Sequence, residues 1–308
     1  MPRMQQSQVA IVTGGGRGIG RAIALALAGS GASVAVLARS AGEIEETAAL
    51  ITAAGGVARA WAVDVTDAGA VGRGVNEVGR ALGPVDVLMN NAGILGPIAP
   101  FWESSVEDWW RTADVNLRAP ILCTHAVLPS MIARRRGRIV NVVTGAAPIA
   151  YFSAYVSSKS ALIRFSECLA IEVRPFGLSV FAMGPGTVRT RMSGHSLNSL
   201  EGRSWIPWFR RIFDEGLDLP VDRPAALAAA LASGAYDGLS GLTLTPFDDL
   251  DAMREHLPEI ERDRLYTMRI RTLSTTPASA ALAAIRADAE RPREPDASSP
   301  RKGPRPPA

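Results

Sequence analysis

The 308-residue sequence contains little lysine and little cysteine, and both shortages limit what the protein can be. Lys159 and Lys302 are the only lysines among 33 basic residues, so arginine carries almost all of the positive charge. A lysine inside the region that reads as folded suggests a role that a guanidinium cannot fill, such as a compact ammonium whose pKa can shift. Two cysteines, Cys123 and Cys168, do not suggest a disulfide framework, and we expect both to be free, buried thiols in a reducing cytoplasm.

The sequence also has no long apolar run. No segment approaches the ~18–20 residues of a membrane span, and the first residues, MPRMQQSQ, contain no apolar stretch typical of a signal peptide. The net charge is only +3, and Arg134–Arg136, the one compact basic run, lies at the expected end of a helix. The three histidines lack the spacing of metal ligands. We therefore expect no membrane, no nucleic-acid partner, no metal and a cytoplasmic location.

What the sequence does contain is a regular alternation of short apolar runs and helical patterns. The expected strands are Val9–Val12, Ser33–Ala38, Ala58–Val63, Asp86–Asn90, Arg138–Val143, Leu178–Met183 and Leu242–Thr245. The expected helices lie near Gly18–Ala28, Glu43–Ala54, Ala68–Leu82, Ser104–Ala133, Ala154–Arg174 and Ala225–Gly234. A capping box of Ser104 and Glu107 opens the fourth helix. This pattern predicts an α/β fold with a doubly wound, Rossmann-like sheet of seven parallel strands and helices on both faces.

The composition divides the chain into three parts. Residues 1–7 form an N-terminal extension, residues 8–274 a single catalytic domain, and residues 275–308 a Pro-, Ser- and charge-rich tail that we expect to be disordered. Within the domain, residues 189–219 lack clear periodicity, and an irregular segment of this length is typical of a functional lid. The side chains of this expected substrate lid include Met192, His195, Trp205, Trp208 and Phe209.

A glycine-rich segment follows the first expected strand and opens directly into a helix. It reads TGGGRGIG, and Gly14, Gly18 and Gly20 occupy the positions of a T-G-x-x-x-G-x-G loop. Glycines let the backbone approach a pyrophosphate closely, and the helix N-terminus supplies free N–H groups and a positive dipole. No G-K-[ST] follows, which excludes an NTPase phosphate loop. The segment therefore predicts a dinucleotide site.

The end of the second expected strand bears on which nicotinamide cofactor is bound. An acidic residue there binds the ribose 2′-hydroxyl, whereas an arginine accommodates a 2′-phosphate. The sequence has Arg39 with no acid at the strand end, and Arg39 and the loop residue Arg17 together can clamp a phosphate. We therefore favour NADP(H) over NAD(H), the alternative being that either arginine is a solvated surface charge. Asp64-Val65 and the NNAG segment, Asn90 to Gly93, lie where the adenosine would pass over the sheet edge.

A tyrosine and a lysine, Tyr155 and Lys159, are spaced four residues apart where a helix begins after the fifth strand. On a helix these positions share a face and lie ~6 Å apart. A phenol with its ordinary pKa of ~10 is a poor acid–base group at neutral pH. We expect the Lys159 ammonium, together with a positive nicotinamide ring, to lower the pKa of Tyr155.

In this arrangement the chain resembles the short-chain dehydrogenase/reductase family in its single-domain form, from about Gln8 to Leu250. The motifs recur in the family's order: TGGGRGIG, Asp64, NNAG, Asn116 in DVNLRAP, Tyr155-x-x-x-Lys159 and Pro185-Gly186-Thr187-Val188-Arg189-Thr190. The resemblance implies that Tyr155 is the general acid/base and that Lys159 binds the nicotinamide ribose. It also implies that Asn116 holds a water of a proton relay, and that Val188 and Thr190 orient the carboxamide.

The chain departs from the family at one catalytic position. The family usually has a serine thirteen residues before the tyrosine, within an N-x-S-S run, but here Asn141-Val142-Val143-Thr144 ends eleven residues before Tyr155. We predict that Thr144 takes the serine's place and polarises a substrate carbonyl. The predicted cofactor-binding residues are Thr13, Gly14, Gly16, Arg17, Gly18, Ile19, Gly20, Arg39, Asp64, Val65, Asn91, Ala92, Gly93, Tyr155, Lys159, Pro185, Gly186, Val188 and Thr190.

The sequence as a whole predicts an NADP(H)-preferring oxidoreductase acting on a carbonyl or a secondary alcohol, with Asn116, Thr144, Tyr155 and Lys159 as catalytic residues. The lid aromatics and Tyr151 favour an apolar substrate, although core or subunit contacts are the alternative reading. By analogy with the family, the long helices favour a homo-oligomer, a dimer or tetramer. A non-catalytic NAD(P)-binding regulator or scaffold of the same fold is the main alternative. A sugar-nucleotide epimerase fits less well, because such enzymes have a different glycine spacing and a larger C-terminal substrate domain.

Overall fold

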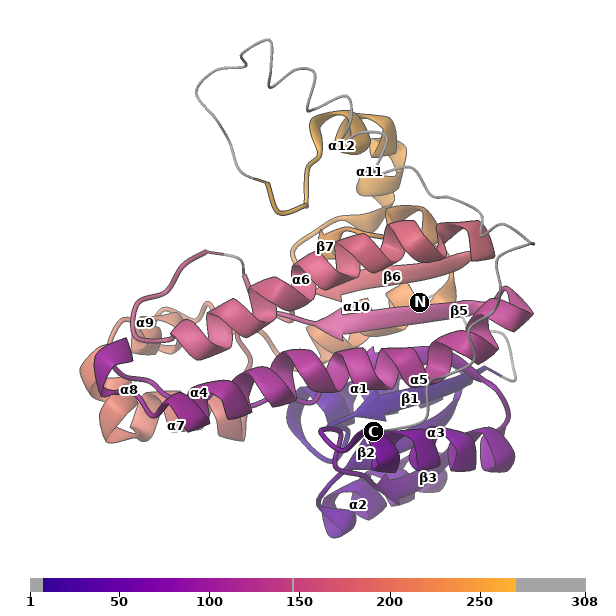
Figure 1. Cartoon of the computed structure of the whole chain (residues 1–308), viewed down its shortest axis with the longest axis horizontal. Coiled ribbons are helices and arrows are strands. Elements are labelled where there is room, and N and C mark those ends of the chain that lie inside the picture. The colour runs from indigo at the N-terminus through magenta and orange to yellow at the C-terminus, as the bar shows by residue number, and fades with distance from the viewer. Residues whose placement is uncertain (1–7, 146, 270–308) are drawn as a thin grey trace.

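The computed structural model describes residues 8–145 and 147–269, so the expected extension and tail lie outside it. Seven parallel strands form one sheet in the order β3-β2-β1-β4-β5-β6-β7 (Figure 1). This is the doubly wound order, with a switch point between β1 and β4 where ligands bind. The strands are β1 Val9–Thr13, β2 Ser33–Ala38, β3 Val57–Ala62, β4 Val85–Asn90, β5 Gly137–Val142, β6 Leu178–Met183 and β7 Thr243–Leu244. The predicted fold class is confirmed.

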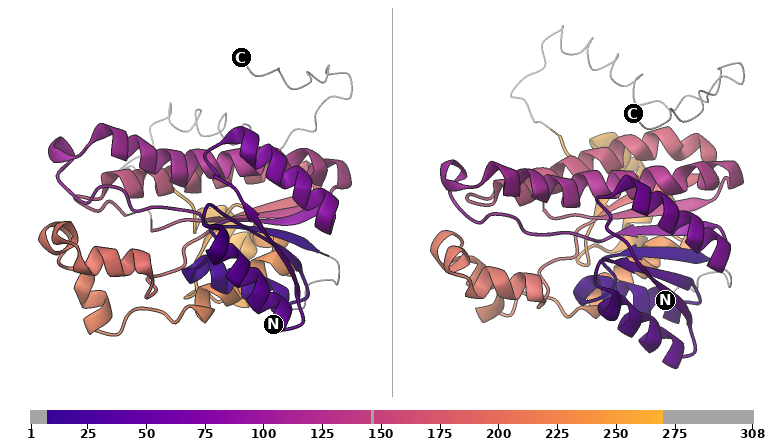
Figure 2. Two further views of the ribbon diagram at one scale, coloured as in Figure 1. Left: turned by 90° about the horizontal axis from the view of Figure 1, so that it is seen from below. Right: turned by 60° about the horizontal axis from the view of Figure 1, so that its bottom comes forward.

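Helices cover both faces of the sheet, as Figure 2 shows with the sheet seen nearly edge-on. One face packs against α1 (Gly18–Gly29), α2 (Ala41–Ala53) and α10 (Asp222–Ser233). The other packs against α3 (Ala68–Leu82), α5 (Ala119–Arg134) and α6 (Ser153–Val173). Because both faces are covered, β1, β4 and β6 are buried at every residue. This is why these strands read as continuous apolar runs instead of alternating ones.

The helix expected at Ser104–Ala133 is interrupted, and its expected start is wrong. It consists of α4 (Val106–Ala113), a π-helical segment η2 (Asp114–Arg118) and α5. The Ser105 hydroxyl, and not that of Ser104, accepts the Asp108 N–H at 3.1 Å and caps α4. Ser104 instead ends the 3₁₀ turn η1 (Phe101–Glu103) and donates to the Pro100 carbonyl at 3.1 Å.

The predicted lid is helical and not irregular. It contains α7 (Arg191–Asn198), α8 (Leu200–Trp205) and α9 (Phe209–Asp214), which lie together beyond the carboxyl ends of the strands (Figure 1). Thr190 begins α7 with a capping box to Ser193, and the Ser199 hydroxyl accepts the Gly202 N–H at 3.0 Å to cap α8. These caps stabilise helices that are too short to show a periodic apolar pattern.

The remaining elements lie near the last strands. They are η3 (Arg174–Phe176), η4 (Asp237–Leu239), α11 (Leu250–Glu255) and α12 (Leu257–Asp263). Beyond α12 the chain returns to α6, where the Met268 N–H donates to Glu167 Oε1 at 2.7 Å. Both cysteines are free, as expected, but only Cys123 is buried. Cys168 is exposed, because it lies on the outer side of α6. Within the described residues, no helix is long and apolar enough to cross a membrane.

Candidate active site

A cleft of about 840 Å³ lies at the carboxyl ends of the strands, at the switch point of the sheet. Most of the predicted cofactor-binding residues line it. They are Gly14, Gly16, Arg17, Gly18, Ile19, Gly20, Arg39, Asp64, Val65, Asn91, Ala92, Gly93, Tyr155, Lys159, Pro185 and Thr190. Residues that are far apart in the sequence, from the first strand to the lid, therefore meet around one cavity.

The glycine loop is shaped to receive a flat, charged group at the N-terminus of α1. Gly14 has a φ of +64°, which favours glycine. A Cβ atom at Gly20 would overlap the Gly14 carbonyl oxygen and the Asn91 amide. Any side chain at this position would therefore force the glycine loop out of its observed conformation. Arg17 is the N-cap residue of α1, but its side chain accepts no hydrogen bond from the helix. The first N–H groups of α1 therefore remain available to a ligand. These features fit a dinucleotide pyrophosphate.

Thr13 supports the loop from behind and does not line the cleft. Its hydroxyl accepts the N–H groups of Asn91 at 3.0 Å and Ala92 at 3.1 Å. The Asn91 side chain in turn donates to the Thr13 carbonyl at 3.0 Å. The NNAG segment is thereby fixed against the glycine loop. Asn90, the first residue of this segment, is buried and donates to Asn141 Oδ1 of β5 at 2.8 Å.

Asp64 lines the cleft, and its carboxylate is held by its own turn. Oδ1 accepts the Thr66 N–H at 2.9 Å and the Thr66 hydroxyl at 2.7 Å. These two hydrogen bonds lower the pKa of Asp64, with a smaller contribution from the charge of Arg39. Asp64 therefore shapes the turn and keeps its negative charge in the cleft at neutral pH.

The wall opposite the glycine loop carries Tyr155 and Lys159. Lys159 is buried, and its Nζ donates to the Val142 carbonyl of β5 at 2.7 Å. Burial lowers the pKa of Lys159 to about 8. Burial of the Tyr155 phenol raises its pKa to about 12, which is opposite to the expected lowering. The ring of Tyr155 stacks on that of Phe152 at 5.0 Å between centroids, so the phenol lies in apolar surroundings that disfavour its charged form.

Asn116 is fully buried in the π-helical segment η2 and does not line the cleft. Its side chain accepts the Ile94 N–H at 2.9 Å and donates to the Ile94 carbonyl at 2.8 Å. A weaker contact joins its Nδ2 to the Ser158 hydroxyl at 3.3 Å. Asn116 therefore holds the loop that follows NNAG, and the π-helical turn supplies the local geometry that aims its amide there.

Three further predicted residues lie at the border of the cleft without lining it. Thr144 lies two residues after the end of β5, but the residues of this segment that line the cavity are Val142 and Val143. Gly186 has a φ of +72° and turns the chain after β6. Val188 is buried and bridges to Leu219, which ties the two ends of the lid together.

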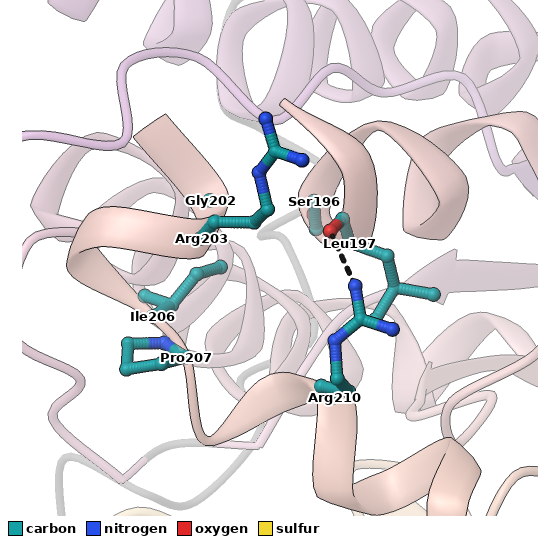
Figure 3. Close-up of a pocket in the computed structure, with 7 residues that line it drawn as sticks. All are labelled: Ser196, Leu197, Gly202, Arg203, Ile206, Pro207 and Arg210. Atoms are coloured by element: carbon teal, nitrogen blue, oxygen red, sulfur yellow. Dashed lines mark hydrogen bonds between the residues drawn. The ribbon is translucent and has the colours of Figure 1, made fainter. Parts of the chain in front are cut away.

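An apolar cluster lies beside Tyr155 at the lid side of the cleft. The rings of Tyr151 and Trp205 are in contact, with their centroids 4.9 Å apart and their planes tilted by 44°. Trp205 and Phe209 pack on this cluster, whereas Trp208 is exposed. The buried residues of this apolar cluster are Ile98, Phe152, Val156 and Ile206. The lid also lines a smaller, open pocket of about 250 Å³, where Arg210 donates to the Leu197 carbonyl at 3.3 Å (Figure 3).

Several residues that line the cleft were not predicted as site residues. They are Ala38, Ser40, Glu43, Val63, Thr66, Ile94, Leu95, Gly96, Val115, Val142, Val143, Arg189, Arg191, Met192 and His195. Most of them directly follow a strand or a predicted motif, so proximity in sequence could have identified them. Glu43 and Arg191 are different, because they enter the cleft from the first turns of α2 and α7.

The strand order and the glycine loop define a dinucleotide-binding fold, and the Tyr155–Lys159 pair in the same cleft is typical of an oxidoreductase. A family model described as short chain dehydrogenase matches residues 8–200. A short chain dehydrogenase of Pseudocercospora fijiensis is 36% identical over 279 residues, covering 86% of this chain and 90% of the relative. The chain therefore belongs to the short-chain dehydrogenase/reductase family, whose members bind nicotinamide cofactors, and is an oxidoreductase.

Solved structures are similar to this chain in fold as well. An actinorhodin polyketide ketoreductase variant with NADPH has a TM-score of 0.73 and 30% identity, and the match covers 79% of this chain and 97% of the other. An NAD⁺-bound xylitol dehydrogenase has a TM-score of 0.72 and 27% identity, and the match covers 78% and 97%. The two neighbours differ in cofactor, so the fold alone does not select between NADP(H) and NAD(H).

Proposed function

We propose that the protein is an NADP(H)-preferring dehydrogenase or reductase that interconverts a carbonyl and a secondary alcohol. The observation that carries the proposal is the shared cleft, because Tyr155 and Lys159 line the same cavity as the glycine loop. A bound nicotinamide cofactor supplies or accepts the hydride. The chain itself must then supply a proton donor or acceptor, a group that holds the substrate oxygen, and an orienting charge.

Residues around the cleft can fill each of these roles. Tyr155 is the proposed acid/base, giving a proton to the carbonyl oxygen or taking it from the alcohol. Thr144, beside the cleft, is the proposed second hydrogen-bond donor to that oxygen. Lys159 is proposed to bind the nicotinamide ribose, and its bond to the Val142 carbonyl fixes its position. Asn116, through its two bonds to Ile94, positions the adjoining loop in addition to its proposed place in a proton relay.

The charges at the adenosine end of the cleft support NADP(H). Arg17 and Arg39 both line the cavity, and no acidic residue stands at the end of β2. Replacing Arg39 by Ala should weaken NADPH binding much more than NADH binding. An equal loss for both cofactors would contradict a 2′-phosphate role for Arg39.

We propose an apolar ketone or secondary alcohol as the substrate. The apolar cluster around Phe152 and Ile206 adjoins Tyr155, and Trp205 closes it from the lid. Met192 adds a flexible apolar side chain at the cleft wall. A panel of ketones of increasing apolar bulk, followed by NADPH absorbance, tests this proposal. A preference for small or charged carbonyl compounds would contradict it.

The acid/base assignment is tested by Tyr155→Phe with Tyr236→Phe as its matched control. Tyr155→Phe removes only the phenol oxygen, so we expect turnover to fall by at least about 10²-fold while NADPH affinity stays close to wild type. Tyr236 lies away from the cleft, where its hydroxyl donates to Asp251 at 3.3 Å. Its Phe variant should retain full turnover. A Tyr155→Phe protein that keeps the wild-type rate would refute the assignment.

We further propose that the protein forms a homo-oligomer in the cytoplasm. Phe101, Trp102, Val106 and Trp110 of η1 and α4 are exposed, and they form an apolar surface that subunit contact would cover. Sedimentation should give a mass of two or four times the 32.5 kDa chain, and a monomer would contradict the proposal.

The proposed cytoplasmic location rests on the two free cysteines, which fit a reducing compartment. Recovery of the protein in a secreted fraction would contradict this location.

A further inference from the structure

The start of the lid lies directly over the phosphate end of the cleft. A Cβ atom at Gly18, the first residue of α1, would be 3.5 Å from Cγ2 of Thr190. Arg191 is the next residue and the first of α7, and it lines the cleft from the lid side. The N-terminus of α1 and the start of the lid therefore lie close together, beside the place where a dinucleotide pyrophosphate would bind.

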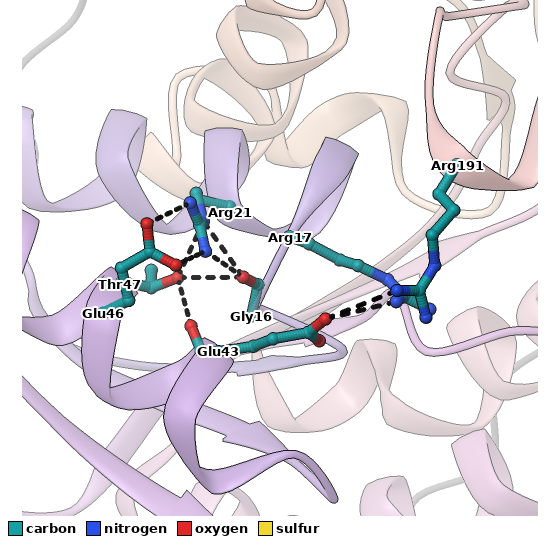
Figure 4. A network of polar contacts seen from close by, with 7 residues as sticks. All are labelled: Gly16, Arg17, Arg21, Glu43, Glu46, Thr47 and Arg191. Atoms are coloured by element: carbon teal, nitrogen blue, oxygen red, sulfur yellow. Dashed lines mark hydrogen bonds and ion pairs between the residues drawn. The ribbon is translucent and has the colours of Figure 1, made fainter.

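Arg191 meets the other side of the cleft through one carboxylate, that of Glu43. Glu43 Oε1 pairs with Arg17 Nη1 at 3.2 Å and with Arg191 Nη1 at 3.9 Å, as Figure 4 shows. Glu43 lies in the first turn of α2 and is held close to the glycine loop, because a Cβ at Gly16 would be 2.9 Å from its Cβ. One carboxylate thus bridges a loop arginine and a lid arginine.

The ion pair between Arg191 and Glu43 is longer than the ion pair that Glu46, on the same helix, makes with Arg21. Arg21 pairs with Glu46 at 2.6 Å and also donates to the Gly16 carbonyl at 2.6 Å, which fixes the loop to α2. Glu46 does not line the cleft. The Arg191 side chain is 75% exposed and meets Glu43 only at the outer limit of an ion pair, so little free energy holds it there.

The excess of positive charge indicates what else these arginines can bind. Three arginines, Arg17, Arg39 and Arg191, line the cleft. The two carboxylates that line it, those of Glu43 and Asp64, offset only part of this positive charge. Phosphate oxygens accept shorter and stronger hydrogen bonds from guanidinium groups than a single exposed carboxylate at 3.9 Å does. An arriving phosphate therefore competes with Glu43 for the same guanidinium groups.

We propose that Arg191 binds a phosphate group of the dinucleotide from the lid side, and that Glu43 competes with that phosphate for Arg191 and Arg17. Binding then transfers Arg191 from Glu43 to the phosphate and draws the lid onto the cofactor. Glu43 lowers affinity most for the cofactor with the most phosphate charge, so it reduces the preference for NADP(H) over NAD(H) that Arg17 and Arg39 create. The inference rests on the proposed function, because it takes a nicotinamide dinucleotide as the ligand of the cleft.

The test measures binding, not turnover, in four variants arranged as two matched pairs. Arg191→Ala is compared with Arg203→Ala, which removes an exposed lid arginine beside the smaller pocket and away from the cleft. Glu43→Gln is compared with Glu45→Gln, which removes the same charge from an exposed position of the same helix outside the cleft. Dissociation constants for NADPH, NADH, ADP-ribose and adenosine 2′,5′-bisphosphate are measured by calorimetry, with unfolding temperatures as a check on folding.

We expect Arg191→Ala to weaken NADPH binding by about two- to fivefold and Glu43→Gln to strengthen it by a similar factor, with little change in either control. A loss confined to NADPH and adenosine 2′,5′-bisphosphate assigns Arg191 to the 2′-phosphate, whereas a loss shared by ADP-ribose assigns it to the pyrophosphate. Equal effects within each matched pair would overturn the inference, since general charge would then explain them. Failure of the wild-type protein to bind any of the four ligands would instead refute the proposed function.

Discussion

The buried ammonium of Lys159 gives the protein a stability that depends on pH in a predictable direction. Its side chain is 3% exposed and has the Val142 carbonyl as its hydrogen-bond partner. Burial lowers its pKa from 10.5 to about 8, so the native state holds this proton less tightly than the unfolded chain does. Lys159→Met removes the ammonium while keeping an unbranched chain of similar length.

The sign follows from which state binds the proton. Below about pH 8 both states hold it, and the full cost of burying the ammonium is present. Between pH 8 and 10.5 the unfolded chain holds a proton that the native state has lost, so the free energy of unfolding rises with pH. The full lowering of the Lys159 pKa changes the free energy of unfolding by on the order of 3 kcal/mol across this pH range. Tyr155 opposes this only above about pH 10, where its unfolded phenol loses a proton that the native phenol, with a pKa of about 12, retains.

Urea unfolding at a series of pH values between 6.5 and 10 measures the effect. The stability of the wild type minus that of Lys159→Met should rise by about 2 kcal/mol from pH 7.5 to 9.5, as the buried ammonium loses its proton. Tyr155→Phe is the control and should leave this rise intact, because the phenol does not titrate in that range. A difference that stays constant with pH would show that Lys159 is not buried as an ammonium at neutral pH.

Three other substitutions distinguish the cleft from the opposite end of the sheet. Gly20→Ala places a Cβ against the Gly14 carbonyl and should cost about 1–3 kcal/mol and most of the cofactor affinity. Gly29→Ala, on the same helix and in open space, is the control and should be neutral or stabilising by up to about 1 kcal/mol. Thermal unfolding and NADPH titration measure both variants. Equal effects of the two substitutions would contradict the observed geometry of the glycine loop. Asp86→Ala removes the buried acceptor of the Val9 N–H and of Arg134 at 2.6 Å, and should cost about 2–3 kcal/mol in urea unfolding without changing kcat. A lower kcat at unchanged stability would show that this end of the sheet acts on the cleft.

The sheet could be predicted from the sequence because its signal is local. Every expected strand lies within about one or two residues of an observed one, since burial on both faces requires continuous apolar runs. The π-helical segment at Asp114–Arg118 was not predictable in this way. Its residues lie inside a longer helical pattern with no local signal of a π-helical turn, and the deviation accompanies the hydrogen bonds between Asn116 and Ile94, which are twenty-two residues apart.

The lid shows a different limit. Its helices have six to eight residues, fewer than the two to three turns over which an apolar stripe becomes visible. The signals that were present are caps, at Thr190 with Ser193 and at Ser199 with Gly202. Each is a single residue among many Ser and Thr positions, so only the structure distinguishes a cap from a loop residue. α11, which begins with the Asp249 cap, was missed for the same reason.

The site residues also fall into two groups, those that a local sequence pattern predicts and those that it does not. Glycine-loop and NNAG residues were predictable because each motif follows its strand directly and needs only the parallel sheet to place it. Glu43 and Arg191 carry no such motif, since their positions depend on how α2 and the lid pack around the glycine loop. The positions of Glu43 and Arg191 are therefore determined by tertiary packing, whereas Arg17 and Arg39 lie in or beside a recognisable motif and could be predicted from the sequence.

The direction of the Tyr155 pKa change has a consequence for the reaction. At spacing i, i+4 the sequence predicts that Lys159 activates the phenol, but Lys159 Nζ is engaged with Val142, and burial raises the phenol's pKa to about 12. The phenol is therefore protonated at neutral pH, which suits the donation of a proton to a carbonyl oxygen. Alcohol oxidation instead needs the phenolate, so its rate should climb from pH 7 to 9 while ketone reduction changes little. Reduction consumes a proton, so the ratio of the two directions changes with pH whatever the acid/base group is. If the Tyr155→Phe variant kept the wild-type rise of the oxidation rate between pH 7 and 9 in steady-state kinetics, Tyr155 could not be the proton acceptor.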